Sequence, residues 1–392
     1  MKKERTAGGL AARLKEERVS IAVLVVLLAV FAAACLWLRP ESSDDETAEF
    51  VEYEKAVIVS VLSDTTQADP ASDGALRGEQ TLLAEVKTGR YAGQTMMVYN
   101  YVGPIYGVAL KEGDGASLTI STYAGGDHAA TVYEYNRIPA LIAVVLLFCL
   151  ATVLVGRGTG LKSLVGLAIT VVCLFRILFP LLMRGAPTLP AVFLLCAYIA
   201  AVSFTILGGV HRKTVCAFLG TLAGTAIALA FGLLAQALAR VDGLRLSDVQ
   251  PLLQLRQTGT PLGLRGLLVA GVVVSALGAV MDVAMPISSA LEEVHAANPS
   301  RTGRELFRSG MNIGRDMVGT MTNTLILAFL GSGFTLILYL YSLGLSRYQL
   351  LTSAYAATEI ISGVASSIGM ILSIPLTALI SSALIARRSA ER

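Results

Sequence analysis

A membrane-length apolar run opens with polar residues that recur at helical spacing. Asn312, Asp316, Thr320 and Asn323 are separated by four, four and three residues, so they share one face of a helix. Carboxylate, amide and hydroxyl oxygens suit hard cations and protons, and they also hydrogen-bond polar solutes. Because such groups are costly at membrane depth, they usually face a bundle interior or an aqueous cavity. The row therefore indicates a site for a small polar or ionic solute, with a cation favoured.

Three residues outside this row complete the candidate binding site. Asp282 lies in the preceding apolar run, and Ser275 lies seven residues earlier on the same helix face. Glu359 lies near the start of the last apolar run. Two nearby carboxylates repel each other, so Asp282 and Asp316 together would bind a cation or share a proton. We expect this site between the sixth, seventh and eighth membrane helices.

Arg304, Arg308 and Arg315 form a basic stripe just before the polar row. The preceding Thr302-Gly-Arg-Glu305 has the pattern of a capping box, which predicts that a helix begins near Gly303 and continues into the apolar run. One interpretation of the stripe is a cytoplasmic mouth that handles charge. The other is an interfacial surface that faces lipid headgroups.

Arg176 is a separate cation, deep in the third apolar run. A buried cation needs an acidic or carbonyl partner. Glu359, Asp282 or Asp316 could supply that partner, so we predict an ion pair with one of them.

The composition places these residues in a membrane. Of the 392 residues, 54% are hydrophobic and 15% are charged, whereas about 25% of residues are charged in soluble proteins. The sequence predicts eight membrane-length runs, at about 19–38, 139–156, 163–183, 190–209, 214–238, 266–286, 316–342 and 353–386. The last run is long and contains Pro375, so it is either kinked or broken into a re-entrant pair.

The segment between the first two runs has a different pattern. Alternating β-branched stretches separated by glycine-containing turns predict about five strands and a small OB-like β-barrel. The predicted fold is thus an all-α polytopic membrane bundle with a small extracytoplasmic barrel domain. Its parts are a basic N-terminus at 1–18, a first helix at 19–38, the barrel at 41–137, a seven-helix domain at 138–386 with a cytoplasmic loop at 287–315, and a cytoplasmic tail at 387–392.

The distribution of Lys and Arg predicts orientation and partners. These residues are concentrated in alternate loops, which favours cytoplasmic termini and a barrel outside; the loop at 239–265 is an exception. They lie at the ends of apolar runs rather than in clusters, so we expect no nucleic-acid partner. The expected partners are the lipid bilayer and a small solute or ion, with a homo-oligomer left open. We expect no cofactor, and the sequence identifies no metal.

Enzymatic motifs are missing from the sequence. It has no His-Glu-x-x-His, Gly-x-Ser-x-Gly or phosphate-binding Walker pattern, and only three histidines. Two membrane carboxylates also occur in intramembrane aspartyl proteases, but neither Met281-Asp282 nor Arg315-Asp316-Met317 has the sequence context of that class. We therefore expect a protein that is not an enzyme.

Three stretches resemble the YibE/F family of bacterial multispanning membrane proteins: Gly278-Ala-Val-Met-Asp-Val-Ala-Met-Pro-Ile-Ser-Ser, Gly310-Met-Asn-Ile-Gly-Arg-Asp-Met-Val-Gly-Thr-Met-Thr-Asn-Thr, and the segment from Glu359 through Ile374-Pro-Leu-Thr-Ala. The resemblance covers about residues 50–385. It implies a bacterial cytoplasmic membrane, and it brings no settled activity with it.

The function that these residues favour is a transporter or channel for a small polar or ionic solute. The alternative is an envelope sensor or assembly factor that transports nothing and whose barrel binds a ligand or partner protein. Exposed aromatic residues on the barrel, such as Tyr99, Tyr101 and Tyr106, would favour the alternative.

Overall fold

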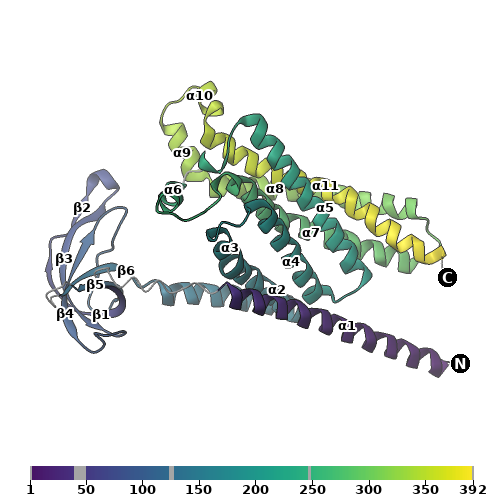
Figure 1. Cartoon of the computed structure of the whole chain (residues 1–392), viewed down its shortest axis with the longest axis horizontal. Coiled ribbons are helices and arrows are strands. Elements are labelled where there is room, and N and C mark those ends of the chain that lie inside the picture. The colour runs from purple at the N-terminus through teal and green to yellow at the C-terminus, as the bar shows by residue number, and fades with distance from the viewer. Residues whose placement is uncertain (1, 39–49, 123–127, 246–248, 391–392) are drawn as a thin grey trace. The chain divides into compact units, whose positions relative to one another are not determined.

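A computed structural model describes residues 2–38, 50–122, 128–245 and 249–390 (Figure 1). The predicted start of the barrel domain, at 41–49, lies outside the described residues. So do the side chains of the basic N-terminus at 2–18 and those of the tail from 387 onward. The chain divides into a helical unit, Met1–Pro40 with Val155–Arg392, and a second unit, Glu41–Leu154, which contains a barrel.

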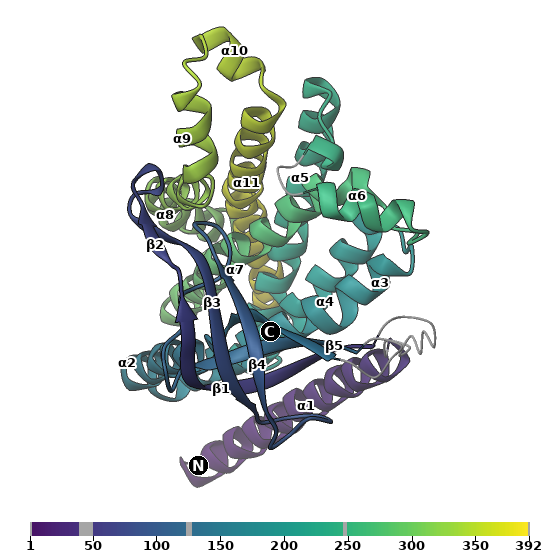
Figure 2. The ribbon, with the colours of Figure 1, turned by 90° about the vertical axis from the view of Figure 1, so that its left-hand side faces the viewer.

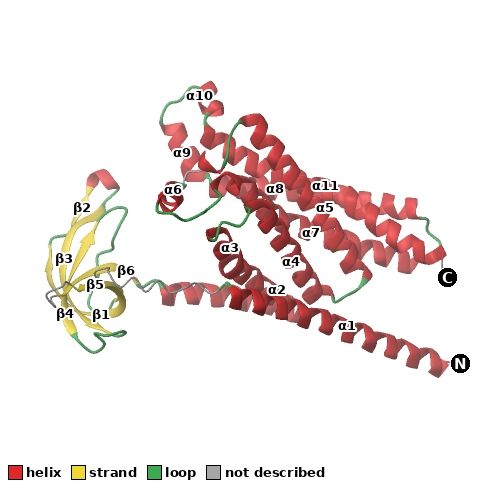
Figure 3. Ribbon diagram, in the orientation of Figure 1, coloured by secondary structure: helices red, strands yellow, loops and turns green. Residues whose placement is uncertain are grey.

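The barrel is a closed ring of five strands with one short additional strand (Figure 3). The order β1-β5-β6-β4-β3 closes through the pairing of β1 with β3, and β4 and β6 are parallel. The strands are β1 (Phe50–Asp64), β2 (Gln67–Asp69), β3 (Ala75–Val86), β4 (Thr95–Val102), β5 (Gly115–Thr122) and β6 (His128–Tyr135). This arrangement confirms the predicted OB-like barrel.

Alternation of side chains gives the barrel its core. In β4, residues alternate strictly between exposed and buried, because successive side chains point to opposite faces of a strand. Val98 is buried together with Ile58, Leu82 and Leu118. The outward positions of the same strand include Tyr99 and Tyr101, which are about half exposed.

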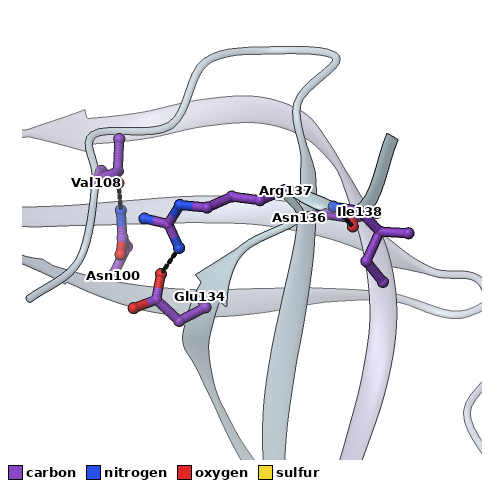
Figure 4. A network of polar contacts seen from close by, with 6 residues as sticks. All are labelled: Asn100, Val108, Glu134, Asn136, Arg137 and Ile138. Carbon is purple, nitrogen blue, oxygen red and sulfur yellow. Dashed lines mark hydrogen bonds and ion pairs between the residues drawn. The ribbon is translucent and has the colours of Figure 1, made fainter. Parts of the chain in front are cut away.

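Polar contacts hold the loop after β4 and the exit from the barrel (Figure 4). The buried Asn100 donates from Nδ2 to the Gln80 Oε1 atom and to the Val108 carbonyl oxygen, both at 2.9 Å. At the end of β6, Arg137 pairs with Glu134 at 2.6 Å. The Asn136 side chain accepts a hydrogen bond from the backbone N–H of Ile138, where α2 begins. These bonds satisfy buried and terminal groups that would otherwise be costly.

The helices are α1 (Lys2–Trp37), α2 (Ile138–Cys173), α3 (Phe179–Met183), α4 (Thr188–Gly208), α5 (Arg212–Ala239), α6 (Gln250–Gln257), α7 (Leu267–Ala297), α8 (Gly303–Ser332), α9 (Phe334–Ser342), α10 (Arg347–Thr352) and α11 (Ala354–Ala390). A π-helical segment, η2 (Leu174–Leu178), joins α2 to α3, and short 3-10 helices are η1 (Pro70–Ser72), η3 (Gly243–Arg245) and η4 (Leu264–Gly266).

Within the described residues, six helical segments are long and apolar enough to cross a membrane, or seven if the bent pair α8 and α9 is one span. Two of the predicted runs, 139–156 and 163–183, belong to a single stretch, Ile138–Met183. That stretch is interrupted at Arg157, whose φ of 48° is not helical. The number of membrane-length helices confirms the predicted polytopic bundle.

Small residues allow α11 to pack closely against α5. A Cβ atom added at Gly224 would lie 2.6 Å from the Ser373 Cβ atom, and one at Gly369 would lie 2.6 Å from the Ala228 Cβ atom. Only glycine fits at such distances. Gly220, one turn before Gly224, belongs to the same contact, since a Cβ there would meet Thr377.

The break in the chain lies elsewhere than the sequence suggested. We predicted either a kink or a re-entrant pair in the last run; α11 is one continuous helix with Pro375 inside it, so the re-entrant pair is not present. The run before it is the broken one, because α8 and α9 meet at Gly333 with a bend of 61°. Figure 2 shows that α9 leads to α10 and that α11 then runs back in the opposite direction.

Candidate functional site

The helix α8 has two different faces. It begins at Thr302, whose side chain accepts a hydrogen bond from the Glu305 backbone N–H, while the Glu305 carboxylate accepts one from the Thr302 N–H at 2.8 Å. This is the predicted capping box. On one face, Gly310 and Gly314 lie close to Leu291 and Ile287 of α7 and to residues of α11. That face is therefore fixed by packing.

The opposite face of α8 carries the polar row found in the sequence. Asn312, Asp316, Thr320 and Asn323 are all exposed, and we refer to these four residues as the polar stripe. Thr320 donates only to its own helix, to the Met317 carbonyl oxygen at 3.2 Å. In the described part of the chain, the side chains of the other three residues form no hydrogen bond or ion pair. The stripe is thus a row of polar side chains on the exposed face of α8.

Asp282 lies on an exposed face of α7. Its helix neighbours on that face include Gly271 and Gly278, where an added Cβ would meet nothing within 4 Å. The buried residues of α7, such as Val280 and Val283, lie on its other side. No hydrogen bond among the described residues joins Asp282 to Asp316, and their shared site stays a prediction.

Ser275 and Glu359 have other surroundings. The Ser275 and Ser366 hydroxyl oxygens lie 2.7 Å apart, which places Ser275 in the contact between α7 and α11. Glu359 is half-buried and lines an apolar cavity among α8, α9, α10 and α11. The three helices expected to form the site do pack together, but Ser275 and Glu359 do not join the polar stripe.

Arg176 lies in the π-helical segment η2 and is exposed. Within the described residues it forms no ion pair with Glu359, Asp282 or Asp316. The predicted pairing is therefore not present, because η2 packs against α1, α3 and α4 rather than against the helices that carry these carboxylates.

The basic stripe leads into a polar cavity of about 460 Å³ at the start of α8. Arg308 lines this cavity, whereas Arg304 and Arg315 are exposed without lining it. The remaining lining residues are Asn298, Ser300, Arg301, Glu305, Ser309 and Asn312. Arg301 donates to the Ser309 hydroxyl at 3.2 Å.

Arg301 and Ser309 also line this cavity, although neither was predicted as a site residue. The signal was available, because Arg301, Glu305, Arg308 and Asn312 follow one another at spacings of three and four residues. Asn312 belongs both to the cavity and to the polar stripe. The two features are therefore continuous along α8.

Metal coordination has no support from acidic or sulfur clusters. Among the described residues, no group of three or more His, Cys, Asp or Glu side chains is placed to hold a metal ion. The cysteines Cys173, Cys196 and Cys216 are buried and unpaired in disulfides.

The model of YibE/F-like proteins matches residues 144–387. The chain belongs to the YibE/F-like family. The match covers the helices from α2 to α11 and begins after the barrel, so the barrel lies outside it, contrary to the extent of 50–385 that we expected. Neither a curated protein nor a solved structure matches this YibE/F-like chain.

Proposed function

We propose that this protein transports or conducts a small polar or ionic solute, with a cation favoured. The polar stripe on α8 carries this proposal. It runs over about three turns of a helix that belongs to a bent pair of membrane-span length. A carboxylate and two amides are costly in contact with lipid tails, so they normally face water or other protein.

The start of α8 supports a continuous route. The polar cavity of about 460 Å³ ends at Asn312, and Asp316 follows one turn later on the same face. A solute that enters between Arg301 and Glu305 would therefore reach the carboxylate without crossing an apolar surface. Asp316 would attract a cation, while Thr320 and Asn323 would replace part of its hydration shell.

A second copy of the chain is the arrangement that best protects the stripe from lipid. Amide and hydroxyl groups both donate and accept hydrogen bonds, so identical stripes can face each other across a symmetry axis with their polar groups satisfied. In this proposal the pathway lies between copies. Asp282 lies on a separate exposed face of α7. In the same oligomer it would line a surface next to the pathway.

We place the protein in the bacterial cytoplasmic membrane, with both termini cytoplasmic and the barrel outside. This orientation takes the 46-residue stretch Ile138–Met183 as two crossings divided at Arg157, and the bent pair α8 and α9 as one crossing. The excess of Lys and Arg in alternate loops supports this orientation. The cavity at the start of α8 is then the cytoplasmic mouth.

Flux through liposomes tests the proposal. Purified protein would be reconstituted and screened for movement of Na⁺, K⁺ and protons. We expect one cation to move, and Asp316→Asn to reduce its flux by about tenfold or more, because the variant removes the negative charge that attracts the cation; a tenfold loss corresponds to about 1.4 kcal/mol. Glu293→Gln, which removes an exposed carboxylate away from the stripe, is the matched control. Wild-type flux no greater than that of empty liposomes, or unchanged flux in Asp316→Asn, would refute the proposal.

A sensor or assembly factor is the second candidate, and one observation favours it. Tyr99, Tyr101 and Tyr106 on the barrel are 43%, 52% and 57% exposed. Tyrosines present a large apolar ring together with a hydroxyl, so they are common at binding surfaces. Substituting the three with serine should leave cation flux unchanged if the transport proposal holds.

A further inference from the structure

A second cavity lies apart from the polar stripe. It has a volume of about 300 Å³ and lies among α8, α9, α10 and α11. Its walls are apolar, with Phe329, Ile337, Leu340 and Ile360 among them. Glu359 is the one ionisable side chain among the described residues that line it. The cavity therefore combines an apolar surface with one negative charge.

The break between α8 and α9 brings this carboxylate to the cavity wall. Gly333 lies at the bend and is buried, and a Cβ added there would lie 3.4 Å from the Glu359 Oε2 atom. The carbonyl end of α8 and the N–H end of α9 meet at this glycine. Their partial charges have opposite signs and offset each other. The charge of the cavity is therefore that of Glu359.

Within the described residues, the Glu359 carboxylate makes no hydrogen bond or ion pair. An ionised group in apolar surroundings needs a partner of opposite charge. An anion would be repelled, and a neutral apolar molecule would leave the carboxylate unpaired. A bare hard cation needs about six oxygen ligands, which these walls do not supply.

We propose that this cavity binds a small amphiphilic organic cation. Its charged group pairs with Glu359, and its aromatic or aliphatic body packs against Phe329 and Ile337. The volume lies at the lower end of the roughly 300–1,000 Å³ range of ligand sites, so the ligand is small. This site uses no residue of the polar stripe, and the inference is independent of cation flux.

Equilibrium binding of two probes tests the inference. Radiolabelled phenyltrimethylammonium and benzenesulfonate share an aromatic ring and carry opposite charges. Each would be titrated against the full chain in nanodiscs, with binding to empty nanodiscs subtracted. We expect saturable binding of the cation only, and a loss of affinity of about tenfold or more in Glu359→Gln.

Two further variants make the result specific. Ile337→Trp narrows the cavity and keeps the carboxylate, so it should also lose the cation. Glu293→Gln removes an exposed carboxylate of α7, and this variant should bind the cation as the wild type does. Absence of saturable binding of the cation, equal binding of both probes, or unchanged binding of the cation in Glu359→Gln or Ile337→Trp would overturn the inference.

Discussion

The hydroxyl oxygens of Ser275 on α7 and Ser366 on α11 lie 2.7 Å apart. Ser366 can also donate to the Ser362 carbonyl oxygen of its own helix at 2.8 Å, and Ser275 to the Val272 carbonyl oxygen at 3.0 Å. The two helices therefore meet through a pair of small polar residues. Such contacts bring backbones close together and stabilise helix association in membranes.

Replacing Ser275 with alanine should reduce the stability of the bundle and leave solute flux intact. A hydrogen bond of this kind contributes about 0.5–1.5 kcal/mol. Melting of Ser275→Ala, Ser366→Ala and the double variant in detergent would isolate the pairwise term. The double variant should lose less than the sum of the single variants. A loss of flux in Ser275→Ala at unchanged stability would instead return this serine to the transport site.

The close contact between α5 and α11 gives a second stability prediction. Gly224→Val should destabilise the protein by about 1–3 kcal/mol or more, because its Cβ would overlap Ser373 and Val280. Gly271→Val is the matched control, since an added Cβ there meets nothing within 4 Å. Thermal melting of both purified variants checks the difference. Equal melting temperatures would contradict the packing in which α11 rests on α5.

Much of this fold follows from periodicity in the sequence. Alternation in β4 and the glycine turns predict the barrel, and the capping box at Thr302 predicts the first residue of α8. The short β2, with three residues, carries too little pattern to be predicted. The break at Gly333 was also missed, because apolar residues flank it on both sides and Pro375 gave a stronger signal for a break.

The candidate site was predicted less completely. Helical spacing correctly grouped the polar stripe on one face of α8, because that spacing is a local property of the helix. Spacing cannot tell which neighbour a face meets. Ser275 and Asp282 share a stretch of α7, yet Ser275 contacts α11 whereas Asp282 is exposed. Partners such as that proposed for Arg176 depend on tertiary packing, which one sequence does not specify.

Acid should weaken the barrel through Asp64. The hydroxyl and backbone N–H of Thr66 and the amide of Gln80 donate to this carboxylate and hold its pKa below the ordinary value of 3.8. Because the pKa is lower in the folded state, the stabilisation is present above about pH 4 and is lost as the pH falls through the folded pKa.

Asp64→Asn should therefore lower barrel stability at pH 7 and flatten its dependence on pH in the acid range. Both effects can be measured by hydrogen exchange of β1 and β3 in the full chain. The exchange rates are compared between pH 7 and pH 3 after correction for intrinsic rates. Glu112→Gln, in an exposed turn, removes a carboxylate that accepts no described hydrogen bond. The hypothesis fails if both variants show the same pH dependence.

Labelling of single cysteines tests the orientation. In a background without the five native cysteines, Ser117→Cys on the barrel should react with an impermeant maleimide in intact cells. Ser300→Cys, at the exposed start of the loop before α8, should react only after permeabilisation. The reverse pattern would place Arg301 and Arg308 outside and remove the cytoplasmic mouth.

The polar stripe makes the final prediction, which concerns copies of the chain. If identical stripes face each other in the membrane, Asn323→Cys in the background without native cysteines should form a disulfide between protomers under mild oxidation. Asn323 is exposed on α8 and has no partner among the described residues. Leu379→Cys is the control, because Leu379 is 55% exposed but lies on α11, away from the stripe. Crosslinking at both positions would indicate random collision, and crosslinking at neither would leave the stripe facing something other than a second copy. The proposal expects a dimer band for Asn323→Cys alone, formed by oxidation in native membranes, resolved on a denaturing gel and reversed by a reducing agent. Such a band would place the Asp316 residues of neighbouring protomers about two helical turns from the crosslink, near the same axis.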